Sequence, residues 1–143
     1  MEKIKYLLFL DDIRDPFEND GEWLVFSPFG GTRDFQTIWV KSYEEFIKWI
    51  KENGLPDGIC FDHDLGEDIA IEMVSNGTNK KVARKIKKEA PSGFDCAKWV
   101  IEYCMDNELD FPKYNIQSAN PVGKDNINGI IQSYRKFKDR EDV

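Results

Sequence analysis

The chain contains few of the residues that characterise metal-rich or disulfide-rich proteins. It has one histidine and three cysteines in 143 residues, and Cys60, Cys96 and Cys104 form no CxxC pair. A histidine-rich zinc site, a sulfur-bound metal and a disulfide framework are therefore all disfavoured. We expect three reduced core cysteines, as in a cytoplasmic protein.

Long apolar runs and an excess of positive charge are also missing. No apolar stretch reaches the roughly 20 residues that cross a membrane, and the run before Asp11 does not have the pattern of a signal peptide. The formal net charge is −7, so the summed field repels nucleic-acid phosphates and anionic lipids. We expect neither long nucleic acid nor a membrane as a partner. A small phosphate-bearing ligand, held by a metal or a local basic patch, is compatible with this charge.

The residues that are present indicate one globular domain over residues 1–143, since 41% are hydrophobic and 13% aromatic. The run Tyr6–Leu10 is continuously apolar and ends at an Asp-Asp pair. This pattern is typical of a parallel strand buried on both faces. Three further strands are predicted, at Gln36–Val40, Gly58–Phe61 and Tyr114–Gln117.

Three helices are predicted from capping signals and apolar periodicity. They cover residues 43–53, residues 95–107 and residues 125 to about 137, and a capping box, Ser42 with Glu45, precedes the first. Strands that alternate with helices indicate βαβ units and a mostly parallel α/β sheet.

Two segments do not fit this alternation. Residues 15–35 and 65–92 are interpreted as long loop insertions, which in compact domains are usually functional or mobile. The second contains a run of basic residues, Lys80, Lys81, Arg84, Lys85, Lys87 and Lys88. They form either a solvated helix face or a basic lid over the site described next. If they form a lid, deletion of residues 70–90 should weaken anionic ligand binding and leave the fold intact.

Polar side chains follow three of the predicted strands. They are Asp11, Asp12, Asp62, His63, Asp64, Ser118 and Asn120. Open parallel sheets bind ligands beyond the carboxyl ends of their strands, where the strand order reverses. If the order is 2-1-3-4, strands 1 and 3 are neighbours about 4.8 Å apart. Carboxylates at that range repel, which raises a pKa or recruits a cation.

A hard divalent cation, Mg²⁺ or Mn²⁺, suits this edge, with Asp11, Asp12 and Asp62 as its ligands. Asp62 is a ligand or a nucleophile. Because side chains alternate along a strand, Asp64 is expected to point the same way as Asp62, and His63 the other way. His63 is then a general acid/base or an orienting group, and the predicted catalytic set is Asp62, His63 and Asp64. The alternatives are a turn or helix cap for the Asp-Asp pair and a structural histidine.

Three further residues are candidates for substrate binding. Arg14 follows the first carboxylates closely, and a guanidinium can bind phosphate through two hydrogen bonds. The alternative is a solvent-facing ion pair with Asp12 or Asp15. Ser118 and Asn120 add a hydroxyl and an amide at the fourth strand, although Ser-x-Asn-Pro alone is also typical of a turn.

The motifs LFLDDIRDP, GICFDHDLG and IQSANPVGKDNI resemble the family of cyclic-phosphate-processing receiver domains, which is similar to the receiver domains of phosphorelay proteins. The resemblance implies a receiver or flavodoxin-like open parallel sheet of order 2-1-3-4 with helices on both faces. It also implies that Asp11 and Asp12 hold Mg²⁺, that Asp62 stands at the phosphoacceptor position and that Ser118 stands near the phosphoryl group. Receivers have a fifth strand that ends in a lysine. Here that strand has no counterpart, and Lys124 is the candidate substitute.

The leading functional prediction is a divalent-metal-dependent phosphoesterase that acts on a small cyclic or nucleotide phosphate. The alternative is a non-catalytic receiver-like module that binds a phosphorylated ligand or a partner protein. His63→Ala separates the two, because an enzyme loses turnover and keeps ligand affinity. A third possibility is a true phosphoacceptor, in which Asp62→Asn would abolish labelling by acetyl phosphate.

Overall fold

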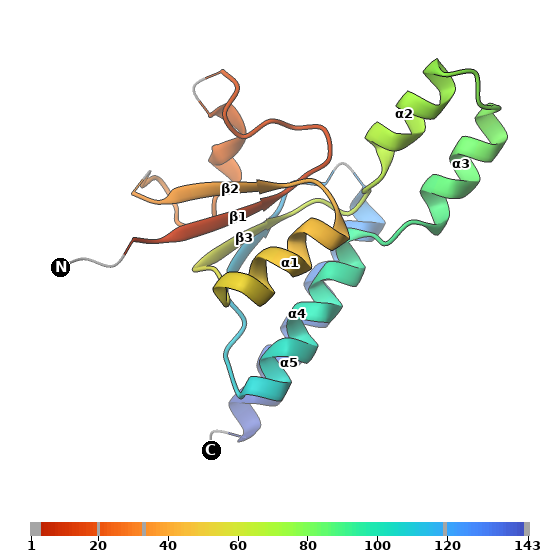
Figure 1. Cartoon of the computed structure of the whole chain (residues 1–143). Helices are drawn as coiled ribbons and strands as arrows, with labels where there is room; N and C mark the ends of the chain where they lie inside the picture. Colours follow the sequence, from red (N-terminus) through yellow and green to blue (C-terminus); the bar gives the residue numbers. More distant parts are fainter. Residues whose placement is uncertain (1–3, 20, 33, 119, 142–143) are drawn as a thin grey trace.

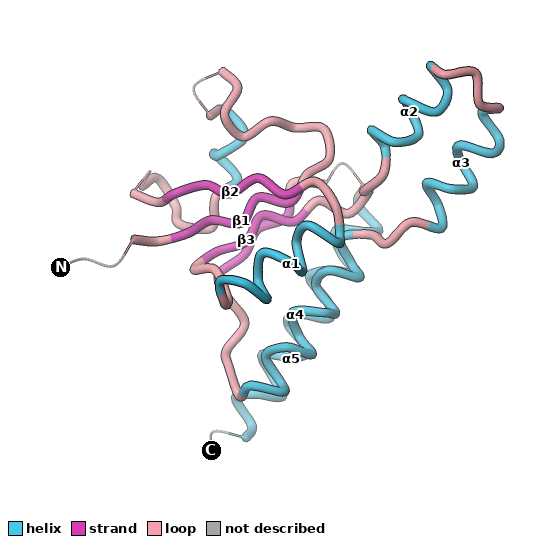
Figure 2. Tube along the Cα trace, in the orientation of Figure 1, coloured by secondary structure: helices cyan, strands magenta, loops and turns pink. Residues whose placement is uncertain are grey.

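The computed structural model describes residues 4–19, 21–32, 34–118 and 120–141 as one parallel sheet with helices (Figure 2). The strands are β1 Tyr6–Leu10, β2 Gln36–Val40, β3 Gly58–Phe61 and β4 Lys113–Ile116. The α-helices are α1 Tyr43–Asn53, α2 Glu67–Ser75, α3 Lys80–Glu89, α4 Gly93–Asn107 and α5 Pro121–Glu141. A short 3-10 helix, η1, covers Glu22–Phe26.

The strand order is β2-β1-β3-β4, and every pairing is parallel, as the sequence predicts (Figure 1). In the register, Phe9 of β1 lies opposite both Trp39 of β2 and Cys60 of β3. Phe61, the last residue of β3, lies opposite Ile116, the last residue of β4. The polar residues that follow these strands therefore leave the sheet at one common edge.

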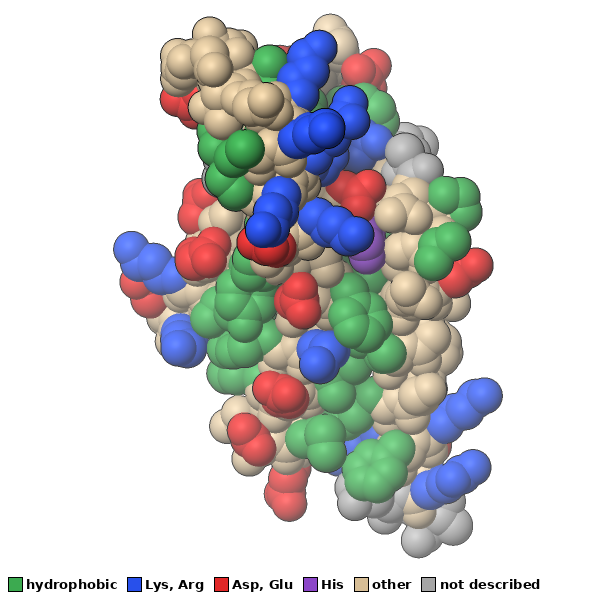
Figure 3. Space-filling model, turned by 90° about the vertical axis from the view of Figure 1, so that its right-hand side faces the viewer, with side chains coloured by type: hydrophobic (Ala, Val, Ile, Leu, Met, Phe, Trp, Pro, Cys, Tyr) green, Lys and Arg blue, Asp and Glu red, His purple; other side chains and the backbone are tan. Residues whose placement is uncertain are grey.

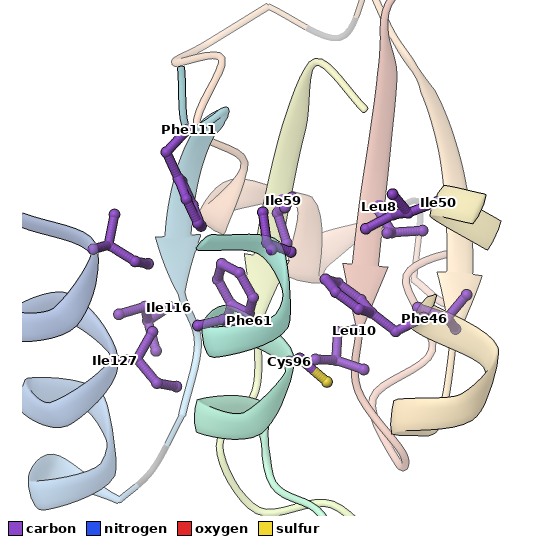
Figure 4. Packing of buried hydrophobic residues seen from close by; sticks show 14 of the residues in the cluster. Leu8, Leu10, Phe46, Ile50, Ile59, Phe61, Cys96, Phe111, Ile116 and Ile127 are labelled. Carbon is purple, nitrogen blue, oxygen red and sulfur yellow. The ribbon is translucent and has the colours of Figure 1, made fainter. Parts of the chain in front are cut away.

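Alternate residues of the strands enter two separate cores. Leu8, Leu10, Ile59 and Phe61 belong to the larger core, which α1, α4 and α5 complete (Figure 4). The smaller core, on the other face, consists of Leu7, Phe9 and Cys60, and the connection between β1 and β2 covers it with Trp23, Leu24, Phe29 and Phe35.

Helices lie on both faces, as expected, but unevenly: among the described residues, the second face carries the short 3-10 helix η1 and no α-helix. The crossovers β2–α1–β3 and β3–α4–β4 both run in the same direction across the sheet. Because parallel crossovers are right-handed, α1 and α4 must lie on the same face. The crossover from β1 to β2 runs the opposite way and lies on the opposite face, and its residues 15–35 contain no α-helix in their described part.

The second insertion, residues 65–92, is not the long loop that the sequence analysis expects. It folds into a hairpin of two helices, α2 and α3, that projects from the body of the domain (Figure 1). Periodicity does not identify these helices because their apolar residues form no buried stripe: Ile71 is 58% exposed and Val82 is 49% exposed. Ala83 is buried, and the side chain of Asn79 caps α3 by accepting a hydrogen bond from the Lys81 N–H.

The last two long helices begin earlier than predicted. A capping box of Ser92 and Asp95 starts α4 at Gly93, two residues before the expected start. The Ser-x-Asn-Pro motif is a helix start, because Asn120 accepts a hydrogen bond from the Gly123 N–H and Pro121 is the first residue of α5. This helix also continues past residue 137, to Glu141.

The three cysteines are buried, as expected, and burial raises the pKa of the Cys60 thiol to about 12. That thiol therefore stays protonated at neutral pH. In the described ranges, no helix combines the length and the apolar character needed to span a membrane.

The N-terminus of α4 approaches the end of β3 very closely. The Gly93 N–H donates a hydrogen bond to the carbonyl oxygen of His63 at 2.8 Å. A Cβ atom built on Gly93 would lie 1.8 Å from the carbonyl oxygen of Asp62. Position 93 therefore accepts only glycine without a shift of backbone.

We predict that Gly93→Ala lowers the free energy of unfolding by about 2 kcal/mol or more, because α4 must move away from β3. Chemical denaturation measures the change. Gly129→Ala, in the middle of α5, is the matched control, because a Cβ atom built at position 129 would meet no atom within 4 Å. It should be neutral or stabilising by up to about 1 kcal/mol. Equal losses in both variants would contradict the close approach at Gly93.

Candidate functional site

Three carboxylates meet where β1 and β3 end. Asp11 and Asp12 follow β1, Asp62 follows β3, and one carboxylate oxygen from each lies within 4.8 Å of the other two. The three residues are at most 5% exposed. The structure thus brings together the three residues that the sequence analysis selects as metal ligands. Three carboxylate oxygens at this spacing match the hard oxygen ligands that Mg²⁺ and Mn²⁺ prefer.

Asp11 is held by the backbone of the turn that it begins. Its Oδ1 accepts hydrogen bonds from the N–H groups of Ile13, at 3.0 Å, and Arg14, at 2.9 Å. The indole of Trp39 donates a hydrogen bond to its carbonyl oxygen at 2.8 Å. Asp11 therefore does begin a turn, which was the alternative interpretation of the Asp-Asp pair. The same side chain still reaches the acidic cluster with its other oxygen.

Arg14 turns inward over the acidic cluster. Its Nη1 lies 3.0 Å from Oδ2 of Asp11 and 3.8 Å from Oδ1 of Asp62. Its guanidinium carbon lies 5.0 Å from the ring centre of Trp23, which η1 contributes. Sequence reasoning missed Trp23 because it lies in a long connection without periodicity. The indole and the two carboxylates hold the guanidinium beside the cluster, where a phosphate could also meet it.

The electrostatics of Asp62 are unusual. Burial, followed by repulsion from Asp11 and Asp12, raises the pKa of its carboxyl to about 8, and the positive charge of Arg14 only partly opposes the shift. One guanidinium is therefore not enough to keep this carboxyl ionised at neutral pH. Asp62 must either hold a proton or receive further positive charge.

Asp64 does not join the acidic cluster and pairs with His63 instead. Its Oδ1 lies 2.8 Å from Nδ1 of His63 and accepts a hydrogen bond from the amide of Asn120 at 3.4 Å. Burial acts to raise the pKa of Asp64, but these two hydrogen bonds outweigh it and lower the pKa. Strand alternation does not set the direction of Asp64, because β3 ends at Phe61. The expectation that Asp64 points the same way as Asp62 therefore stays a prediction.

The imidazole of His63 lies against the first turn of α5. A Cβ atom built on Gly123 would lie 2.3 Å from Cγ of His63, so only a glycine leaves room for the ring. The signal in the sequence is a glycine in the first turn of a helix, where it has low intrinsic propensity. The position of His63 thus depends on α5 as well as on the end of β3, which it follows.

The residues after β4 connect the same edge to α5. The hydroxyl of Ser118 accepts a hydrogen bond from the Asn120 N–H at 3.1 Å. Asn120 caps α5 with its side-chain oxygen and contacts Asp64 with its side-chain nitrogen. Their first role in the structure is therefore to form the turn. Lys124, the candidate for the receiver lysine, lines a groove of about 380 Å³ beside Tyr114, between β4 and α5.

Gln117 is a buried polar residue that the sequence analysis did not select. Its side-chain nitrogen donates a hydrogen bond to the carbonyl oxygen of Leu10 at 3.0 Å, and its backbone N–H donates one to Phe61. Among the described residues, its side-chain oxygen accepts no hydrogen bond. The available signal was a polar side chain directly after the last apolar residue of a strand.

We predict that Asp62 makes the metal-free protein less stable as the pH rises. Its pKa is about 8 in the folded protein, above the ordinary value of 3.8 for an aspartate side chain. The folded protein therefore binds more protons between these values, and the free energy of unfolding falls with rising pH. Asp62→Asn removes this penalty and should stabilise the protein by about 1 to 3 kcal/mol at pH 8, with little gain at pH 4.

Chemical denaturation in EDTA at both pH values measures this difference. Asp106→Asn, on the exposed side of α4, removes the same charge far from the cluster and should give a small effect at both pH values. A gain from Asp62→Asn that is equal at pH 4 and pH 8 would contradict the raised pKa.

Comparisons with known proteins agree with the fold. A family model described as the cyclic-phosphate processing receiver domain matches residues 6–133. No curated protein matches the chain. A solved structure, described as a yeast Spc42 trimeric coiled-coil segment fused to another structure, has a TM-score of 0.52 and 12% identity, and covers 96% of this chain and 78% of that one. That likeness concerns the fold alone. The family match spans most of the sequence, and the chain therefore belongs to the cyclic-phosphate processing receiver domains.

Proposed function

We propose that this domain is a Mg²⁺- or Mn²⁺-dependent phosphoesterase that acts on a small cyclic or nucleotide phosphate. The observation that carries the proposal is the position of two chemically different groups at one edge of the sheet. A buried cluster of three carboxylates ends with Asp62, and the His63–Asp64 pair follows directly in the chain. A metal site and a proton-transfer group side by side are the parts that metal-assisted hydrolysis of a phosphate ester requires.

Asp11, Asp12 and Asp62 would hold the cation. Their oxygens are close enough to one another to share one ion, and the raised pKa of Asp62 reflects a deficit of positive charge at this point. When bound, a divalent cation neutralises charge on phosphoryl oxygens and lowers the pKa of a coordinated water. Arg14, already 3.0 Å from Asp11, would offer its guanidinium to a phosphate beside the cluster.

His63 would move the proton. The carboxylate of Asp64 accepts a hydrogen bond from Nδ1 of the ring, which places the proton on Nδ1 and leaves Nε2 as the basic nitrogen. In hydrolysis of a cyclic phosphate, a water oxygen bonds to phosphorus and one ring P–O bond breaks. His63 takes the proton that the water loses at Nε2 and returns it to the departing ring oxygen, which leaves as a hydroxyl. The product is a phosphomonoester.

A second function is favoured by one observation. His63 fits between Gly123 and Asp64, so the ring could serve only to hold α5 against the end of β3. The domain would then be a non-catalytic module that binds a phosphorylated ligand at the acidic cluster. The two functions make different predictions for a substitution that keeps the size of the side chain at position 63.

We predict that His63→Gln lowers the kcat of metal-dependent hydrolysis by about 100-fold or more, the usual contribution of a general acid or base. Binding of Mn²⁺ and ligand should stay within a few-fold of the wild type. The substrates to test are cyclic nucleotides and ADP-ribose cyclic phosphates. Asp11→Asn should abolish Mn²⁺ binding measured by calorimetry, whereas Asp106→Asn should leave it unchanged.

The outcome that would contradict the phosphoesterase is ligand binding without turnover of any of these compounds in Mg²⁺ or Mn²⁺. If His63→Gln also leaves binding intact in that case, the non-catalytic module is the better description.

A further inference from the structure

Helix α3 is strongly basic in an otherwise acidic chain. Its residues 80–88 hold six of the 20 lysines and arginines of the chain, whose net charge is −7. The one acidic residue of α3 is Glu89, at its C-terminal end. No ion pair joins Lys80 or Arg84 to a carboxylate within the described residues. Such a concentration of positive charge can attract an anionic ligand.

The hairpin of α2 and α3 begins and ends at the candidate site. It leaves the body at Gly66, two residues after Asp64, and rejoins it at Ser92, beside the start of α4. Where it is anchored, a Cβ atom on Gly66 would lie 3.5 Å from Cβ of Ala90, so the two connecting segments touch. The Gly93 N–H bonds to the carbonyl of His63. The base of the hairpin is therefore fixed against the residues of the His63–Asp64 pair.

The basic side chains of α3 lie on the same side of the molecule as this pair. Figure 3 shows blue side chains gathered directly above the single purple histidine and a neighbouring red side chain. Lys87 is near enough to Asp64 to contribute to the lowering of the pKa of that carboxyl. The C-terminal half of α3 is thus the part nearest to the site.

The basic side chains of α3 continue along the helix, away from the site. Residues at positions i, i+4 and i+7 share one side of a helix, so Lys80, Arg84 and Lys87 form one basic row. Because Lys87 faces Asp64, the row leads from the site toward the tip of the hairpin over about 10 Å, at 1.5 Å per residue. The other basic residues, Lys81, Lys85 and Lys88, form a neighbouring row on the same helix.

We infer that the row of Lys80, Arg84 and Lys87 binds a second phosphate of the ligand whose cyclic phosphate lies at the acidic cluster. This inference rests on the proposed function and names the substrate class: a small, nucleotide-type cyclic phosphate that carries a further phosphate group. The ligand is small because α3 carries no aromatic side chain on which bases could stack. The acidic body of the domain also repels a long phosphate backbone.

Calorimetry in Mn²⁺ tests the inference with two probes that differ by one phosphate, adenosine 2′,3′-cyclic phosphate and its 5′-phosphorylated counterpart. The 5′-phosphorylated probe should bind the wild type about tenfold more tightly or better. In the double variant Lys80→Gln with Arg84→Gln, this advantage should disappear, and the affinity for the probe without the 5′-phosphate should stay unchanged.

The matched control is Lys81→Gln with Lys85→Gln, which removes the same charge from the same helix on the neighbouring row. It should keep most of the advantage. Equal affinities of the two probes for the wild type, or equal losses in the two double variants, would overturn the inference. A third probe is an oligonucleotide that ends in a 2′,3′-cyclic phosphate. If its affinity rises with every nucleotide added, the inference that the ligand is small is wrong.

Two measurements separate this inference from the proposed function. If Mn²⁺ binds and the simpler probe is hydrolysed, but the 5′-phosphate adds nothing, the inference alone is wrong. If neither probe is hydrolysed but the 5′-phosphate still gives a gain that depends on Lys80 and Arg84, the phosphoesterase is wrong and the second phosphate site stands.

Discussion

The repulsion among three buried carboxylates is the constraint on which the rest of the site depends. Parallel strands end at a common edge, and the register places Asp62 beside Asp11 and Asp12 where water hardly reaches. The turn N–H groups stabilise Asp11, and Arg14 supplies one positive charge. The pKa of Asp62 remains raised to about 8, which leaves the edge short of positive charge. A divalent cation is the natural complement to such an edge.

Helix placement determines what surrounds this cluster. The right-handed crossovers put α1 and α4 on one face, and α5 packs into the same core. Two of these helices, α4 and α5, then meet the residues at the end of β3 through glycines. Gly93 lets α4 touch the backbone of Asp62, and Gly123 gives the imidazole of His63 its space. The orientation of His63 is therefore a property of how three elements pack. A proton-transfer role requires this kind of fixed position.

The helical hairpin divides the charges of the domain between two parts. The body carries the acidic cluster, and α3 carries six basic side chains. Both ends of the hairpin are attached at the edge of the sheet where the cluster lies. The basic helix α3 and the acidic cluster are therefore on the same side of the domain. This division of charge is the feature on which the proposed second phosphate site depends.

Much of the fold and of the candidate site follows from the sequence alone because the signals are local. The run Tyr6–Leu10 ends in aspartates, Ser42 begins a helix, and the strands alternate with helices, which together predict the parallel sheet and the edge where Asp11 and Asp62 meet. The role of Trp23 could not be predicted, because a contact between a 3-10 helix and Arg14 leaves no periodic pattern.

What the sequence determined by itself was the set of strands and the residues that follow them, since strand propensity and caps act over short segments. The strand order 2-1-3-4 followed from the resemblance to the receiver-like family. Only the tertiary structure decided that α2 and α3 form a hairpin, that the long helices share one face, and that Asp64 pairs with His63 and Asn120. These features depend on close contacts between segments distant in the chain, such as Gly123 against His63. A glycine in the first turn of a helix signals a close approach, but it does not say which distant residue makes the contact.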